Sequence, residues 1–114
     1  MLRLEKTKEN QYDVLSIYGE VDASNSVILD DAIQALLAEG SKFILIDGKN
    51  LEYISSAGLG VFMSYLEEFH EQGVTLKICE LSPRVYEVFR ILGLDQLIPI
   101  YQVKSAALEH WNEV

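Results

Sequence analysis

In Tyr53-Ile54-Ser55-Ser56-Ala57-Gly58-Leu59-Gly60, an apolar strand ends and a helix begins. The first backbone N–H groups of a helix have no partner inside it, so a helix start attracts anions. This segment places two hydroxyl side chains and two glycines at such a position. It therefore predicts an anion site, or a hydroxyl that can itself become an anion, and Ser56 is our candidate for the central residue.

Strands and helices alternate on both sides of this segment. A hairpin is expected first, because Leu2 and Leu4 alternate with charged residues and the run 12–18 is rich in β-branched and aromatic residues. Further strands are expected at 43–47, 74–79 and 98–101, and helices at 22–39, 55–72, 82–92 and from 105 onward. This order predicts one α/β domain over 1–114, with a mixed, largely parallel sheet of about five strands and about four helices packed on it.

Local signals predict where the elements end and which faces they bury. Asp22 or Ser24 is expected to cap the first helix, and a glycine to end each of the first three helices. Gly48-Lys49-Asn50 is expected to form a turn, and Pro99 indicates that its strand lies at an edge of the sheet. The positions with helical period are Val27, Ile28, Ala32, Ile33, Ala35 and Leu36, then Leu59, Phe62, Met63, Leu66, Phe69 and His70, and finally Val85, Val88, Phe89 and Leu92.

The composition is typical of a globular domain, and its negative charge disfavours binding to polyanions. Hydrophobic residues make up 49% of the chain and charged residues 24%, and no apolar run approaches the ~20 residues that span a bilayer. The N-terminus lacks the long apolar segment of a secretory signal, so we expect a cytoplasmic protein. The formal net charge of −9 argues against binding to nucleic acids or to anionic membranes.

Catalytic chemistry at Ser56 is not indicated. The surrounding pattern is not G-x-S-x-G, and a serine nucleophile needs a base beside it. Of the two histidines, His70 would lie fourteen residues further along the helix, ~20 Å away at 1.5 Å per residue. His110 stands alone near the chain end, where a surface position is the ordinary interpretation. We expect no enzyme activity and no catalytic residue.

Metal and cofactor sites are not indicated either. Two distant histidines and the one cysteine, Cys79 on an expected strand, do not form a zinc set. Gly58-Leu59-Gly60 fits neither G-x-x-x-x-G-K-[ST] nor G-x-G-x-x-G. The residues alone leave two questions open. The two serines can be plain helix caps or sites of modification, and the two glycines can serve packing or let another protein press against the backbone.

Four segments stand out together when the chain is read in order. They are Gly19-Glu20-Val21-Asp22, Ile54-Ser55-Ser56-Ala57-Gly58-Leu59-Gly60-Val61, Cys79-Glu80-Leu81-Ser82-Pro83-Arg84-Val85 and Phe89-Arg90-Ile91-Leu92-Gly93-Leu94. In this order and at this spacing they resemble the STAS domain, and in particular the stand-alone anti-sigma factor antagonists of bacteria. The resemblance spans nearly the whole chain.

The resemblance implies a partner switch. In such proteins the unphosphorylated antagonist binds an anti-sigma factor, which is also a serine kinase of the histidine-kinase-like ATPase fold, and the sigma factor is released. The kinase then phosphorylates a serine at the start of the second helix, the complex separates, and a PP2C-type phosphatase resets the cycle. By its position before Gly-Leu-Gly, Ser56 is the implied phosphorylation site, with Ser55 as second candidate. The implied partner-binding residues are Asp22, Ser55, Ala57, Gly58, Leu59 and Gly60.

The chain departs from the family pattern at two positions. Family members often read Asp-Ser-Ser/Thr-Gly-Leu-Gly, whereas here Ser55 replaces the aspartate and Ala57 replaces the second hydroxyl residue. Two other functions stay open beside the switch. One is a non-phosphorylated STAS subunit that regulates a lipid-transporting ABC system. The other is a nucleotide-responsive binding module, and the net charge of −9 counts against it.

Overall fold

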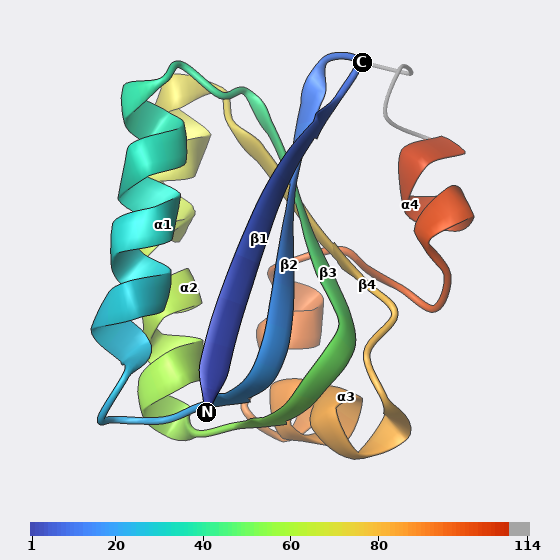
Figure 1. The fold of residues 1–114 in the computed structure, drawn as a ribbon. Coiled ribbons are helices and arrows are strands. Elements are labelled where there is room, and N and C mark those ends of the chain that lie inside the picture. The colour runs from blue at the N-terminus through green and yellow to red at the C-terminus, as the bar shows by residue number, and fades with distance from the viewer. Residues whose placement is uncertain (110–114) are drawn as a thin grey trace.

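The computed structural model describes residues 1–109, which form a five-stranded sheet with helices on both faces (Figure 1). The strands are β1 (Leu2–Glu9), β2 (Tyr12–Val21), β3 (Phe43–Ile54), β4 (Thr75–Cys79) and β5 (Ile100–Tyr101). The helices are α1 (Ser26–Ala38), α2 (Ser56–Gln72), α3 (Pro83–Ile91), the short 3-10 helix η1 (Leu94–Gln96) and α4 (Lys104–Glu109). The predicted α/β domain, with its order of strands and helices, is confirmed.

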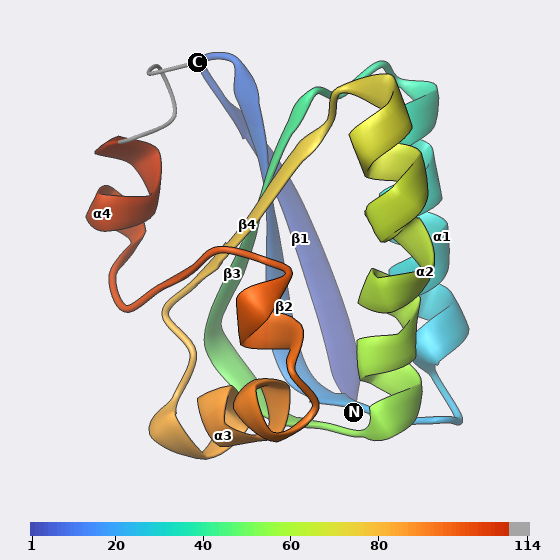
Figure 2. The ribbon, with the colours of Figure 1, turned by 180° about the vertical axis from the view of Figure 1, so that it is seen from behind.

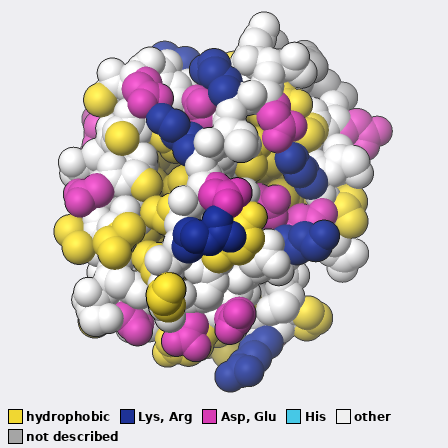
Figure 3. Space-filling view, in the orientation of Figure 1, with side chains coloured by type: hydrophobic (Ala, Val, Ile, Leu, Met, Phe, Trp, Pro, Cys, Tyr) yellow, Lys and Arg dark blue, Asp and Glu magenta, His cyan; other side chains and the backbone are white. Residues whose placement is uncertain are grey.

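The strands lie side by side in the order of the sequence, β1-β2-β3-β4-β5. β1 and β2 are antiparallel, and every later neighbouring pair is parallel. The predicted hairpin and the edge position of the strand that follows Pro99 are both confirmed. Charged side chains of both signs spread over β1 (Figure 3), which suits an exposed edge because such charges discourage pairing with a strand of another molecule.

The sheet separates two hydrophobic cores of unequal size. Helices α1, α2 and α3 cover one face, and α4 covers the other (Figures 1 and 2). Side chains of a strand alternate between faces, so Ile44 and Ile46 join the larger core while Leu45 joins the smaller one. In the smaller core Leu45 meets Cys79 of β4 and Ala107 of α4. The continuous apolar run in β3 is therefore explained by burial on both faces.

β3 continues without interruption through residues 48–50, so the predicted turn there is wrong. The pairing of β3 with β2 instead shifts at this point, which leaves one extra residue in β3. Gly48 lies against a neighbouring side chain, because a Cβ atom there would lie 2.5 Å from Cδ2 of Leu81 and that side chain would have to move. Gly48 therefore does not mark a turn. It lies at an irregularity of β3 that is covered by the Leu81 side chain.

α1 differs from the prediction in its cap and in its buried face. The helix begins after Asn25 and has no side-chain cap, so a cap from Asp22 or Ser24 is wrong. Its buried residues are Leu29, Ile33 and Leu36. Val27 and Ile28, expected in the core, are 60% and 49% exposed, and Ala35, also expected there, is exposed. Three consecutive apolar residues begin this helix, so periodicity alone does not determine which of them turns inward.

The other helices follow the predictions more closely. Left-handed glycines follow α1, α2 and α3, as expected, at Gly40, Gly73 and Gly93. The Ser82 hydroxyl caps α3 by accepting a hydrogen bond from the Val85 N–H at 3.2 Å. The exceptions are three residues expected on buried faces that are exposed in the structure, namely Met63, His70 and Leu92. Each lies at the border of its helix's apolar stripe.

Candidate functional site

The ends of β2 and β3 bring two distant segments of the chain together. Val21 pairs with Ile54, and the Ser55 N–H donates a hydrogen bond to the Val21 carbonyl at 2.9 Å. Parallel strands end at the same edge of the sheet, so Asp22 and the start of α2 emerge side by side (Figure 1). The structure thus brings the predicted acidic residue and the predicted serines to one site.

The two neighbouring serines have different surroundings. The Ser55 backbone is extended, and its hydroxyl accepts a hydrogen bond from the Gly58 N–H at 3.4 Å as the N-cap of α2. Ser56 is the first residue of α2 and is exposed. Within residues 1–109, its hydroxyl forms no hydrogen bond. Ser55 therefore performs the capping role, which leaves the Ser56 hydroxyl available to another protein.

The remaining residues of the motif divide into exposed and buried ones. Gly60 is exposed, and a Cβ atom there would meet nothing within 4 Å, whereas Ala57 is half-buried. A Cβ atom on Gly58 would lie 2.7 Å from Cγ1 of Ile54, so this glycine serves packing. Leu59 is fully buried in the core. Gly58 and Leu59 support the site from inside, and only Gly60 and Ala57 present this part of the helix to a partner.

Asp22 lies in a loop that is ordered by its own side chains. Its carboxylate accepts hydrogen bonds from the Ser24 hydroxyl at 2.5 Å and from the Ser24 N–H at 2.9 Å. Both bonds lower the pKa of Asp22, and the bond from the hydroxyl has the larger effect. The Asp22 carboxylate is therefore ionised at neutral pH. Asn25 holds the loop by accepting from the Asp22 N–H and donating to the Glu20 carbonyl. Sequence reasoning missed Asn25, although an asparagine directly before a helix is a common loop-ordering residue.

The N-terminus of the chain lies beside the same loop. The Glu20 N–H donates a hydrogen bond to the Met1 carbonyl at 3.4 Å, and the Met1 residue is 98% exposed. Figure 1 shows the N-terminus at the end of the sheet where α2 begins. The first residue thus borders the site.

One groove of about 350 Å³ runs between α1 and α2 on one side of Ser56. Val27, Ala57 and Gly60 are among the residues that line it. Hydrophobic side chains appear on the surface over α1 in Figure 3. Val27 and Ile28, which were wrongly expected in the core, supply part of this apolar surface.

A second groove of about 280 Å³ lies on the other side, between the start of α2 and α3. Ser55 and Ser56 form one wall, and Ile91 and Leu92 lie on the α3 side. Ile91 is 67% exposed and Leu92 48%. The exposed apolar residues that line these two grooves are together termed the Ser56 surface, and they are Val27, Tyr53, Ile91 and Leu92. Apolar patches on a protein surface often mark interaction sites, so these residues are the candidate protein-binding surface.

Two of the groups weighed for catalysis and metal binding, His70 and Cys79, lie away from Ser56. His70 is in the last turn of α2, and His110 lies outside the described residues. Burial raises the pKa of the Cys79 thiol to about 12, which keeps it protonated. Within residues 1–109, no three His, Cys, Asp or Glu side chains are placed to hold a metal ion. None of the described helices is long and apolar enough to span a bilayer.

Known proteins share this fold over nearly the whole chain. A family model described as the STAS domain matches residues 3–107. The anti-sigma-B factor antagonist of Bacillus subtilis is 34% identical over 94 residues, which cover 82% of this chain and 85% of that protein. The structure of an anti-sigma factor antagonist from Mycobacterium paratuberculosis matches with a TM-score of 0.87 and 23% identity, covering 96% of this chain and 92% of that one. That of the Bacillus cell fate determinant SpoIIAA in its phosphorylated form matches with a TM-score of 0.70 and 19% identity, covering 96% and 98%.

Proposed function

Because the chain belongs to the STAS domain family, we propose that it is an anti-sigma factor antagonist and that phosphorylation of Ser56 releases its partner. The observation that carries the proposal is the exposed Ser56 hydroxyl at the start of α2, which bonds to no described residue and lines a mainly apolar groove between α2 and α3. The name of the Bacillus subtilis relative supports the type of partner. The phosphorylated form of SpoIIAA supports phosphorylation as the signal.

In the unphosphorylated state, the Ser56 surface binds the anti-sigma factor. Burial of exposed apolar groups such as Val27 and Ile91 contributes ~25 cal/mol per Å² of area removed from water. Gly60 has no side chain, so the backbone of a partner can approach α2 closely at this point. The ionised Asp22 carboxylate gives the partner a charged group to recognise at the border of the apolar area.

In the phosphorylated state, the same surface rejects the partner. The Ser56 oxygen attacks the γ-phosphorus of ATP, the bond to ADP breaks, and the hydroxyl proton passes to a base of the kinase. The product carries about −1.5 to −2 charges at neutral pH. The start of α2 stabilises this charge, so the antagonist stays folded. A bound partner would have to bury the phosphate beside the Asp22 carboxylate, and that desolvation and repulsion oppose the complex.

The cycle needs two further proteins. The kinase in this proposal is the anti-sigma factor itself, a histidine-kinase-like ATPase, and a PP2C-type phosphatase restores the Ser56 hydroxyl. We place the cycle in the cytoplasm. Ser55 remains the second candidate acceptor, but its modification would remove the cap of α2. Phosphorylation at Ser56 changes the surface and leaves the cap intact.

A kinase reaction tests the acceptor. The cognate anti-sigma factor, identified as a histidine-kinase-like ATPase encoded beside this chain, is incubated with the antagonist and ATP, and the product is mapped by mass spectrometry. We expect one phosphate, on Ser56. Ser56→Ala should abolish it and Ser55→Ala should retain it. A phosphate on Ser55 in the wild-type chain, or none on either serine, would contradict the assignment.

A binding titration tests the switch. Ser56→Asp should weaken binding to the same anti-sigma factor at least tenfold, because it places a carboxylate in the apolar contact. Ser105→Asp is the matched control, since it makes the same exchange at an exposed position on α4, on the other face of the sheet. Equal affinities of Ser56→Asp and the control would remove Ser56 from the interface.

A further inference from the structure

β5 leaves part of its backbone without a strand partner. It is the last strand of the sheet in the described chain. The Ile78 N–H donates to the Pro99 carbonyl at 3.0 Å, and the Glu80 N–H donates to the Tyr101 carbonyl at 3.2 Å. Successive residues of a strand direct their backbone groups to opposite sides, so the N–H and C=O of Ile100 point away from β4. These two groups can pair with an extended segment laid along the edge.

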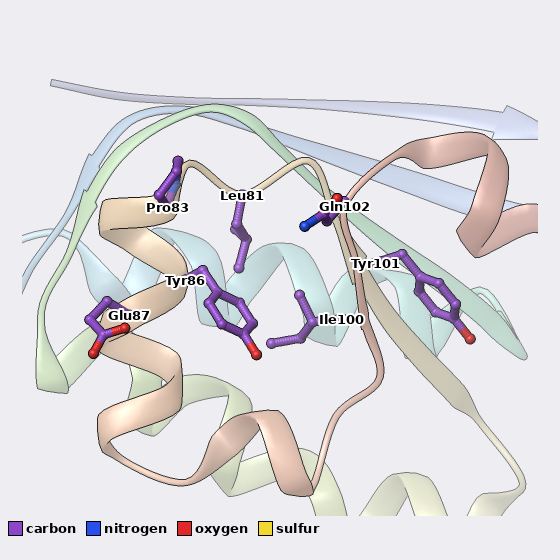
Figure 4. Close-up of a pocket in the computed structure, with 7 residues that line it drawn as sticks. All are labelled: Leu81, Pro83, Tyr86, Glu87, Ile100, Tyr101 and Gln102. Carbon is purple, nitrogen blue, oxygen red and sulfur yellow. The ribbon is translucent and has the colours of Figure 1, made fainter.

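A hollow of about 610 Å³ lies directly beside this edge, between β5 and α3. Figure 4 shows Tyr86 of α3 and Ile100 of β5 pointing toward each other across it, with Leu81 extending between them. The Gln102 amide points toward the same space from the end of β5 (Figure 4). The volume is within the range of sites that hold a small ligand or a large side chain.

The lining of the hollow is uncharged apart from one neutralised group. Glu87 is the charged residue among those that line it, and its carboxylate forms an ion pair with Arg90. Within residues 1–109, the Tyr86 hydroxyl and the Gln102 amide form no hydrogen bond, so both can serve a ligand. This lining offers a ligand no unpaired charge, so it matches an uncharged occupant better than a basic or an acidic one.

We propose that this hollow and the outer edge of β5 form a second docking site, which binds an extended, uncharged segment of another protein. The backbone of that segment exchanges hydrogen bonds with Ile100, and one aliphatic or aromatic side chain enters the space between Leu81 and Tyr86. Strand addition of this kind obtains affinity from the main chain and selectivity from the side-chain pocket. The site is separate from the Ser56 surface, so a protein held there can stay bound while the switch exchanges partners.

The test is a titration of the full chain, labelled with 15N, with uncharged five-residue peptides. The probes are N-acetylated peptide amides Thr-Val-X-Val-Thr, with Phe, Leu, Ile or Val as the central residue X. We expect saturable shift changes at Ile100, Gln102 and Tyr86 for at least one peptide. A version with N-methylated backbone amides should bind at least tenfold more weakly, because it cannot donate to the strand edge. A version with Glu in place of both Val residues should also bind more weakly.

Two variants decide whether the shifts report this site. Tyr86→Arg fills the hollow with a charged side chain and should abolish binding, while Ser56→Asp should leave peptide affinity unchanged. The native fold of each variant is checked from its spectrum without peptide. The proposal is overturned if no peptide saturates, if N-methylation or Tyr86→Arg has no effect, or if the shifts gather around Ser56. Shifts at Ile100 that depend on protein concentration alone would identify a second copy of this chain as the occupant and would also overturn it.

Discussion

The Ser55 hydroxyl accepts a hydrogen bond from the Gly58 N–H, whereas the Ser56 hydroxyl bonds to no described residue. The two serines should therefore differ in their effects on folding. Ser55→Ala is expected to lower the free energy of unfolding by ~1 kcal/mol through loss of the cap. Ser56→Ala should change it by less than ~0.5 kcal/mol, as for other exposed positions. Urea denaturation of both variants measures the difference, and equal losses would show that Ser55 is not the cap.

Cys79 makes stability depend on pH in the alkaline range. Burial raises the pKa of its thiol to about 12, and the nearby carboxylates of Asp47 and Glu80 act in the same direction. A thiol in the unfolded chain ionises at about 8.5. The unfolded state therefore loses this proton first as the pH rises. The contribution of the protonated thiol to the free energy of unfolding is complete below pH ~8.5 and is lost progressively toward pH 12.

The expected slope is up to ~1.4 kcal/mol of unfolding free energy per pH unit. Urea denaturation at several values between pH ~8 and pH ~9 measures it, below the range in which Tyr65, whose pKa is raised from 10.0 to about 12, contributes appreciably. Cys79→Ala is the control. It should be less stable at pH 8 because of the cavity, but its stability should fall less steeply with pH. Parallel profiles for the two proteins would contradict the assignment to Cys79.

At the scale of the element, α1 shows how three adjacent apolar residues can have different roles. Leu29 is fully buried, whereas Val27 is 60% exposed beside Ser56. Leu29→Ala should lower the free energy of unfolding by ~2–5 kcal/mol, because it leaves a cavity in the core. Val27→Lys should alter stability by less than ~0.5 kcal/mol but weaken binding of the anti-sigma factor at least tenfold. Denaturation and titration of both variants separate the two roles, and a strongly destabilised Val27→Lys would place Val27 in the core.

The elements whose type could be predicted are those with an unambiguous local signal. The glycines after three helices agree with the structure, and of the two serines that could cap α2, Ser55 does so. Gly48 could not be interpreted correctly, because the reason for it is the Leu81 side chain, which is distant in sequence. Periodicity also failed at the start of α1, where tertiary packing selects one of several apolar residues. Local sequence patterns predict the type of each element, whereas contacts between elements decide which of its residues are buried.

The candidate site was only partly predictable for the same reason. The Ser55–Gly60 motif is contiguous, so its position at the start of α2 follows from the sequence. The Ser56 surface is assembled from α1, the end of β3 and the C-terminal end of α3, and its members Val27, Ile91 and Leu92 are exposed only because other residues fill the core. Asn25 holds the neighbouring loop through contacts that no motif specifies.

At the scale of the whole molecule, α3 lies between the two surfaces. Its last residue, Ile91, borders the Ser56 groove, and Tyr86, near its start, borders the hollow beside β5. Ile91→Lys should therefore weaken binding of the anti-sigma factor at least tenfold and leave peptide affinity unchanged. Tyr86→Arg should have the reverse effect. Calorimetric titrations of both variants with both ligands give the comparison, and a variant that weakens both would show that the surfaces are coupled through α3.

The position of the N-terminus has a practical consequence. Met1 is 98% exposed and lies beside the Asp22 loop, so anything attached to it is held at the rim of the Ser56 surface. A large affinity tag there would compete with the partner and make a functional antagonist look inactive. A small fluorophore on the terminal amine, in contrast, would change its emission each time a partner arrives or leaves. Such a label would report partner binding without any altered side chain.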